Sequence, residues 1–176
     1  MTVLHTARLT LRPLRADDID RVITLASDAR VMAPLGGPLS ARESRTWLDR
    51  QLAHISEHGY GRCVVTLGAQ FVGLVGLSRF DFDRGLVPAT EVAWRLVSAH
   101  WGRGYATEAA RAVIDQGFTH FDLSHVVAVT SVDNARSRRV MDKLGMHHRP
   151  NDDFDHPLLP EGDPLRRHVV YRLRRL

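Results

Sequence analysis

Trp101-Gly102-Arg103-Gly104-Tyr105-Ala106-Thr107-Glu108-Ala109-Ala110 is the stretch around which the rest of the chain is organised. Residues 90–97, just before it, have the β-branched and aromatic content of a strand. After it, apolar residues recur at helical spacing as far as Phe118. The two glycines therefore lie at a junction between a strand and a helix. Backbone N–H groups at such a helix start have no intrahelical partner, so this junction is predicted to bind an anion such as phosphate.

The spacing of these glycines separates this loop from two familiar phosphate loops. A Walker loop needs Gly, four residues and then Gly-Lys-Ser/Thr, and a dinucleotide fingerprint needs one glycine more. A Gly-x-Gly stretch alone also fits an ordinary tight turn. The flanking strand and helix favour phosphate binding, and a second motif, Asn134-x-x-Ser137, favours it further.

Length and composition indicate one domain across residues 1–176, with a core of its own. No apolar run approaches the ~20 residues needed to span a membrane. Arginines 8, 12 and 15 interrupt any apolar signal segment at the N-terminus. The single cysteine, Cys63, excludes an internal disulfide, and its apolar neighbours favour a buried side chain over a nucleophile. We therefore expect a cytoplasmic protein.

The formal net charge is +4, and Lys143 is the single lysine, so arginine carries the positive charge. A basic surface can bind nucleic acid, or it can attract an anionic cofactor such as coenzyme A. The sequence has neither a zinc-ligand spacing nor the aromatic signature of an RNA-binding sheet, which disfavours nucleic acid and gives no metal site. Most of these charges are expected to be solvated surface.

The first third of the chain predicts a strand and two helices. Residues 8–14 alternate as a strand does, and Asp17 opens a helix with Asp18 and Asp20 in or near its first turn. A second helix begins with the capping box of Ser40 and Glu43, continues to about residue 58 and ends at Gly59.

The middle of the chain predicts a hairpin. Residues 61–67 and 70–82 read as its strands, and Gly73 and Gly76 inside the second strand suggest a bulge or a close backbone approach. Residues 81–85 have turn chemistry.

The apolar run at residues 125–130 predicts a strand buried on both faces, paired in parallel with the strand at residues 90–97. Asp133 or Asn134 caps the next helix, and Gly145 ends it. Two terminal strands are expected, at residues 146–149 and 168–173, with a long loop at residues 151–166 between them.

The two motifs resemble those of the GCN5-related N-acetyltransferases (GNAT). That family's pyrophosphate loop is Gln/Arg-x-x-Gly-x-Gly/Ala, which Gly104 and Ala106 match at the last two positions. Trp101 replaces Gln or Arg, as in the branch typified by ribosomal-protein alanine acetyltransferases (RimJ/RimL-type). Residues 131–146 resemble the family's Asn-x-x-Ser…Lys-Leu-Gly-Phe pattern, with Met146 in place of the aromatic residue. The predicted order of elements is also that of the family: strand, two helices, three strands, helix, strand, helix, two strands.

The resemblance implies an α/β fold with a mixed sheet, the acyl-CoA N-acyltransferase fold, in which the strand at residues 90–97 and the next parallel strand splay apart. It implies acetyl-CoA as cofactor. Its pyrophosphate is expected on the amides of Arg103, Gly104, Tyr105, Ala106 and Thr107. The pantetheine arm is expected beside Leu96 and Val97, with the Val97 amide contacting the arm or the acetyl carbonyl. Asn134 also contacts the arm, and Ser137 donates a proton toward the sulfur. The segment at residues 32–39 would line the acceptor cleft, although it also fits a plain inter-helix loop.

The general base is the role with most alternatives. The resembling branch often has a glutamate at the position of Glu91, and partial burial would raise its pKa toward a useful value. A structural salt bridge is nearly as well supported. Arg95 is not expected as its direct partner, because four residues along a strand span ~13 Å. Three histidines have a suitable intrinsic pKa but fit surface positions: His100, His147 and His148.

These observations predict an acetyl-CoA-dependent N-acetyltransferase that passes acetyl directly to a primary amine in a ternary complex, with Cys63 dispensable. The acceptor could be a protein N-terminus, an amino acid, a polyamine or an antibiotic. One alternative is a non-catalytic acyl-CoA-binding module that acts as a sensor or partner subunit. Another is a nucleic-acid binder with strongly salt-dependent affinity. Homodimers are common in the resembling family.

Overall fold

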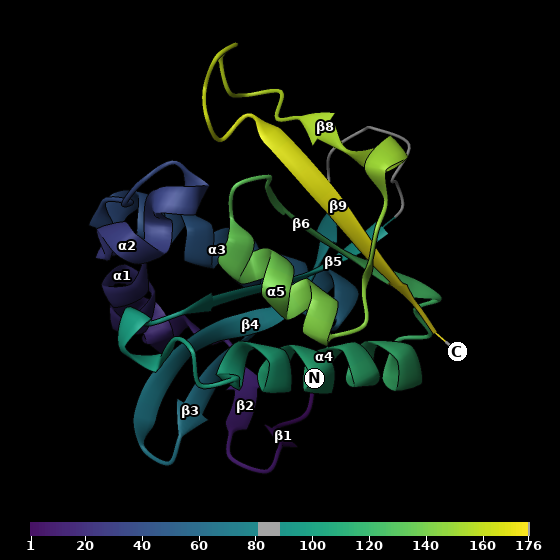
Figure 1. Ribbon diagram of the computed structural model, residues 1–176. Coiled ribbons are helices and arrows are strands. Elements are labelled where there is room, and N and C mark those ends of the chain that lie inside the picture. Colours follow the sequence, from purple (N-terminus) through teal and green to yellow (C-terminus); the bar gives the residue numbers. More distant parts are fainter. Residues whose placement is uncertain (81–88, 176) are drawn as a thin grey trace.

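The computed structural model describes residues 1–80 and 89–175. Within them a single mixed sheet has the strand order β1-β2-β3-β4-β5-β6-β9-β7, and β8 pairs with β9 (Figure 1). The strands are β1 Leu4–His5, β2 Thr10–Pro13, β3 Arg62–Leu67, β4 Gln70–Phe80, β5 Ala89–Leu96, β6 His125–Ser131, β7 His147–His148, β8 Phe154–Asp155 and β9 Arg167–Arg174. The α-helices are α1 Ile19–Ser27, α2 Ala29–Met32, α3 Ala41–His58, α4 Tyr105–His120 and α5 Ala135–Lys143. The predicted α/β fold is confirmed.

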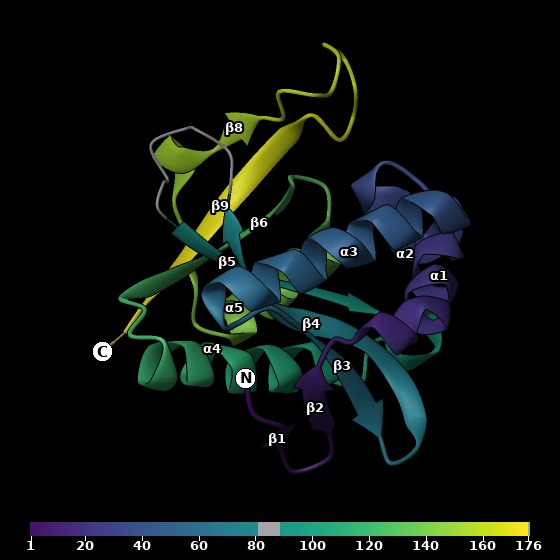
Figure 2. The same ribbon diagram turned by 180° about the vertical axis from the view of Figure 1, so that it is seen from behind.

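Helices cover both faces of the sheet. Figure 1 shows α5 in front of the strands, and Figure 2, from behind, shows α3 across the opposite face. Successive residues of a strand point to opposite faces, so β4 feeds two cores. Val75 packs in the cluster that contains α4 and α5, whereas Leu74 packs with Leu25 of α1 and Leu48 of α3.

The sheet opens between β5 and β6. β5 pairs with β4 in antiparallel register from Phe80↔Ala89 to Gly73↔Leu96, but it pairs with β6 in parallel at Glu91↔Val127 alone. On its other edge β6 pairs with β9 along its whole length, from His125↔Arg174 to Ser131↔His168. The parallel pairing and the splay expected from the sequence are therefore confirmed. The C-terminal end of β5 is left with one edge free of a β6 ladder.

The predicted helix ends are confirmed where local hydrogen bonds determine them. The Ser40 hydroxyl accepts from the Glu43 amide at 3.2 Å, and the Glu43 carboxylate accepts from the Ser40 amide at 2.8 Å. Gly59 and Gly145 have the left-handed φ values of +74° and +77° that suit glycine at a helix end. Asn134 rather than Asp133 caps α5.

Tertiary contacts moved several predicted boundaries. α1 starts at Ile19, after a short 3-10 turn at Ala16–Asp18, because Asp18 is fully buried and bonded to Arg12 instead of lying in an exposed first helical turn. The link before α3 contains the extra helix α2. The strand expected at residues 146–149 is reduced to β7, and the long loop contains β8. The turn expected at residues 81–85 lies outside the described residues.

Gly73 and Gly76 are sites of close backbone approach, as predicted. A Cβ atom at Gly73 would meet the carbonyl oxygen of Arg95 on β5, and one at Gly76 would meet that of Gly61 before β3. A register shift also lies in the facing part of β3. Among the described residues, no helix combines the length and apolar character needed to cross a membrane.

Candidate active site

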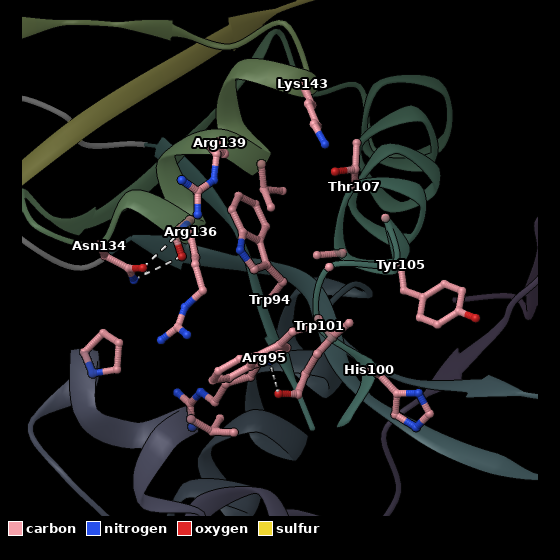
Figure 3. Close-up of a pocket in the computed structure, with 18 of the residues that line it drawn as sticks. Trp94, Arg95, His100, Trp101, Tyr105, Thr107, Asn134, Arg136, Arg139 and Lys143 are labelled. Atoms are coloured by element: carbon pink, nitrogen blue, oxygen red, sulfur yellow. Dashed lines mark hydrogen bonds between the residues drawn. The ribbon is translucent and has the colours of Figure 1, made fainter. Parts of the chain in front are cut away.

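A cavity of about 280 Å³ lies at the end of β5, where that strand parts from β6. Its walls come from the α2 region, β5, the loop before α4, the first turn of α4 and α5 (Figure 3). Trp94 and Arg95 both line it. Because consecutive strand residues point to opposite faces, the cavity connects the α4/α5 face of the sheet with the α1–α3 face.

The glycine loop offers an anion site at one end of this cavity. Gly102 and Gly104 have φ values of +76° and +81°, and Gly104 is the N-cap of α4 with no side-chain cap. The Glu108 amide bonds to the Gly104 carbonyl, so the earlier amides of the turn have no intrahelical acceptor. Four of the five residues predicted to hold pyrophosphate line the cavity: Gly104, Tyr105, Ala106 and Thr107. Arg103 is absent from the lining.

An ion pair anchors this helix start to the N-terminal strands. The Glu108 carboxylate accepts from the Thr6 hydroxyl at 2.6 Å and from Arg8 Nε at 2.7 Å. Burial favours the neutral acid, but these hydrogen bonds outweigh it and lower the pKa of Glu108. The Arg8 guanidinium also lies 4.6 Å from the centre of the Tyr105 ring and donates to the Arg103 carbonyl. The loop geometry is therefore set before any ligand arrives.

Asn134 (Figure 3) and Ser137 both line the cavity at the start of α5, and their side chains are hydrogen-bonded to each other. Asn134 Oδ1 accepts from the Ser137 amide at 3.2 Å, which is the capping role. Asn134 Nδ2 donates to Thr130 Oγ1 at 2.9 Å and to Ser137 Oγ at 3.1 Å. Because the serine oxygen accepts a hydrogen bond, its own proton is directed elsewhere. Ser137 is half-buried and lines the cavity, so this proton can point into it.

Trp101 joins the two halves of the site. Its indole nitrogen donates to the Leu96 carbonyl at 2.8 Å, and the Arg136 guanidinium lies 4.1 Å from the centre of its ring. Arg139 and Lys143 follow Arg136 along the same side of α5 and also line the cavity (Figure 3). Sequence reasoning missed this cationic row. The signal was present as basic residues spaced three and four apart on a helix facing the glycine loop.

The expectation for Val97 is corrected. Its amide donates to the Val72 carbonyl at 3.0 Å, so it belongs to the β4–β5 ladder and is not a free donor. In an antiparallel ladder alternate residues bond to the same neighbour. The peptide groups of Trp94 and Leu96 therefore point toward the opening beside β6. Leu96 lines the cavity, and Val97 does not.

Glu91 forms the salt bridge that the sequence left as an alternative. Arg62 Nη2 lies 3.6 Å from its carboxylate, and the Glu91 side chain is 21% exposed. Burial raises the pKa of Glu91, while the charges of Arg62 and Arg95 oppose that rise. Within the described residues Arg95 forms no ion pair with Glu91, as expected from their spacing. Glu91 is absent from the cavity lining.

The three histidines have different surroundings. His100 lines the cavity, and its Nδ1 atom is buried with no hydrogen-bond partner among the described residues. His148 is 3.0 Å from the Asp153 carboxylate and stacks on Tyr171, a structural arrangement. His147 is exposed, as expected.

Comparison with known proteins identifies the class. The profile of the acetyltransferase (GNAT) domain matches residues 8–147. An acetyltransferase of Agrobacterium tumefaciens str. C58, known from its crystal structure, is 30% identical with a TM-score of 0.79, over 99% of this chain and 95% of that one. The FsC-acetyl coenzyme A-N(2)-transacetylase of Aspergillus fumigatus is 32% identical over 159 residues, 82% of this chain and 65% of that protein.

The chain belongs to the GNAT family and is an N-acetyltransferase. RimL, a ribosomal L7/L12 α-N-protein acetyltransferase solved in complex with coenzyme A, shares the fold with a TM-score of 0.79 at 14% identity, over 98% of each chain. At that identity the comparison shows the shared fold.

Proposed function

We propose that residues 1–176 form one acetyl-CoA-dependent N-acetyltransferase domain, which passes acetyl directly to a primary amine within a ternary complex. One observation carries this proposal. One cavity is lined by the first turn of α4, by Ser137 and by Trp94 and Arg95, which point to opposite faces of β5. A thioester bound from one face can therefore meet an amine that arrives from the other.

The residues at the α4 end fit the phosphates of coenzyme A. The amides of Gly104, Tyr105, Ala106 and Thr107 would hold the pyrophosphate at the positive end of the helix dipole. Arg136, Arg139 and Lys143 place three cations on the facing wall of the cavity. Arg103 is proposed only as a contributor through its amide, since its carbonyl is already bonded to Arg8.

The residues at the β5 end fit the pantetheine arm and the thioester. The peptide groups of Trp94 and the amide of Leu96 point toward the opening beside β6, where an amide-containing arm can pair with them, whereas the Leu96 carbonyl already accepts from Trp101. Asn134 borders the same space, with its side-chain groups held by Thr130 and Ser137. We propose that Ser137 gives its hydroxyl proton to the departing thiolate and regains a proton from solvent.

Glu91 is proposed as the base, acting through water because its carboxylate does not line the cavity. The ammonium of the acceptor would lose its proton along this path before the nitrogen attacks. The raised pKa of Glu91, caused by burial, brings its basicity closer to that of an amine. Arg62 holds the carboxylate in place.

The test measures thiol release from acetyl-CoA with a panel of peptides, amino acids and polyamines. Ser137→Ala and Glu91→Gln should each lower kcat by about 100-fold, the lower end of a general acid or base contribution. Exposed positions on α3 supply matched controls, Ser56→Ala and Glu57→Gln, which should leave kcat within about twofold. The acidic limb of the wild-type pH profile should vanish in Glu91→Gln, because only ionised Glu91 can accept the proton.

Two results would refute the proposal. Full activity in both site variants would remove Ser137 and Glu91 from the chemistry. A labelled acetyl group that stays covalently bound to the protein, and can be chased to the amine, would replace direct attack by an acetyl-enzyme route.

A further inference from the structure

Arg95 occupies the acceptor side of the cavity. Its side chain shares a sheet face with Leu74, its partner across the β4–β5 ladder, and therefore points toward α1–α3. There its guanidinium lies 5.3 Å from the centre of the Trp47 ring, and Nη1 is 3.9 Å from the Met32 sulfur. Arg95 is thus enclosed by apolar and weakly polar groups while it lines the cavity.

No carboxylate in the described part of the chain neutralises Arg95 within ion-pair distance. Glu91, on the same face of β5, is taken by Arg62. Asp28, at the α1–α2 junction, accepts from Ser98 at 2.9 Å and pairs with Arg30 at 3.3 Å.

The surroundings of Arg95 oppose its charge. Burial and the charge of Arg62 lower the pKa of Arg95 to about 10, although the charge of Glu91 opposes that fall. At this pKa the guanidinium is still protonated at neutral pH. Burying a cation without an anionic partner is unfavourable. A ligand anion at this position would therefore be bound strongly.

The phosphates of coenzyme A are not the anion that fits here. Their proposed site is the first turn of α4 with Arg136 and Arg139, on the face of the sheet to which Trp94 points. Arg95 points to the other face, where Arg30, Val31 and Pro34 complete the wall. Figure 3 shows that Arg136 and Arg139 extend from α5, whereas Arg95 extends from β5.

We infer that Arg95 binds a carboxylate of the acceptor, so that the acceptor is an amine that also carries a carboxylate group. This inference rests on the proposed function. The planar guanidinium fork matches a carboxylate with two parallel hydrogen bonds, and the Trp47 ring lies beside that fork. The carboxylate could be the α-carboxylate of an amino acid or an acidic side chain close to a peptide N-terminus.

The test uses reaction products, which need no turnover. Calorimetry measures their binding to the protein saturated with coenzyme A. The first probes are N-acetyl-alanine, N-acetyl-leucine and N-acetyl-phenylalanine, each against its neutral carboxamide. N-acetyl-aspartate α-amide against N-acetyl-asparagine α-amide tests a side-chain carboxylate. At least one acid should bind about 10-fold tighter than its amide, the effect of a charge-assisted hydrogen bond. Which pair responds identifies the source of the carboxylate.

Variants assign this preference to Arg95. In Arg95→Gln the ratio of acid to amide affinity should fall to within twofold, and in Arg95→Lys it should be intermediate. Arg136→Gln removes the same charge from the opposite wall; it should weaken coenzyme A binding and keep the ratio. Thermal unfolding confirms that each variant is folded. Equal binding of acids and amides to the wild type, including no binding of either, overturns the inference, and so does a preference that survives in Arg95→Gln.

The two proposals fail differently. If the wild type acetylates amines with no preference for a carboxylate, Arg95 has no such role and the proposed function stands. If the chain does not bind acetyl-CoA at all, both fall together.

Discussion

Replacing Asp18 by Asn should destabilise the protein far more than the same change two residues later. The Asp18 side chain is fully buried, and Arg12 reaches it with two bonds of 2.7 and 2.6 Å. Arg21 adds a third at 3.0 Å, and the Arg15 amide a fourth at 2.9 Å. Asn can still accept from the amide, but it leaves two guanidinium groups without their anion.

The expected loss in free energy of unfolding is about 3 kcal/mol, the lower end for a broken buried ion pair, because Arg12 keeps some exposure to water. For a chain of this length that corresponds to a fall in Tm of about 6–12 °C. Circular dichroism at pH 7 measures it. The control, Asp20→Asn, removes an exposed carboxylate in the first turn of α1 and should shift Tm by less than about 2 °C.

The pH dependence of this stabilisation follows from the direction in which folding shifts the pKa of Asp18. Burial favours the neutral form of Asp18, but the bonds from Arg12 and Arg15 outweigh it and lower the pKa below its ordinary value of 3.8. The stabilisation is therefore present above pH 3.8 and is lost as the pH falls through the folded-state pKa. The difference in free energy of unfolding between Asp18→Asn and the wild type should therefore become smaller at acidic pH. The reasoning would be refuted if Asp18→Asn lowered the free energy of unfolding by less than 1 kcal/mol at neutral pH, or if Asp20→Asn lowered it by as much.

Two further predictions concern Cys63 and Trp101. Burial raises the pKa of the Cys63 thiol to about 12. Iodoacetamide at pH 8 should therefore label the unfolded chain and leave the native protein unmodified, which mass spectrometry can measure. Rapid labelling of the native protein would contradict the burial of Cys63. Trp101→Phe removes the 2.8 Å hydrogen bond to the Leu96 carbonyl and should raise the KM for acetyl-CoA about fivefold, as for a hydrogen bond worth ~1 kcal/mol. Trp101→Leu should raise the KM further, because Arg136 then also loses the aromatic ring that it contacts. An unchanged KM in steady-state assays would rule out a role for this hydrogen bond.

The local signals in the sequence determined most of the elements. The capping box at Ser40 and the glycines at positions 59 and 145 located helix ends, because their hydrogen bonds join residues only a few positions apart. The apolar run at residues 125–130 predicted the strand there, and the two glycines before α4 predicted the anion loop. Both signals also lie within a few consecutive residues. Such interactions form with little help from the rest of the chain.

The short strands could not be predicted from such local signals. β1, β7 and β8 have two residues each, and each exists because a longer strand lies beside it. A two-residue stretch has no periodicity of its own to read. The 3-10 turn before α1 likewise follows from the burial of Asp18, which the identical side chains of Asp17 and Asp20 do not share.

For the site, the sequence by itself determined which loop and which helix carry the chemistry, since Gly104, Asn134 and Ser137 stand in short motifs. Only the tertiary structure decided that the Val97 amide donates to the Val72 carbonyl and that Arg62 pairs with Glu91. It also decided that Arg95 lines the cavity with no carboxylate of residues 1–80 or 89–175 in ion-pair contact. In each case the residues that meet come from segments far apart in the sequence. Their hydrogen bonds and charges meet after the sheet has assembled, so no local pattern of residue types records them.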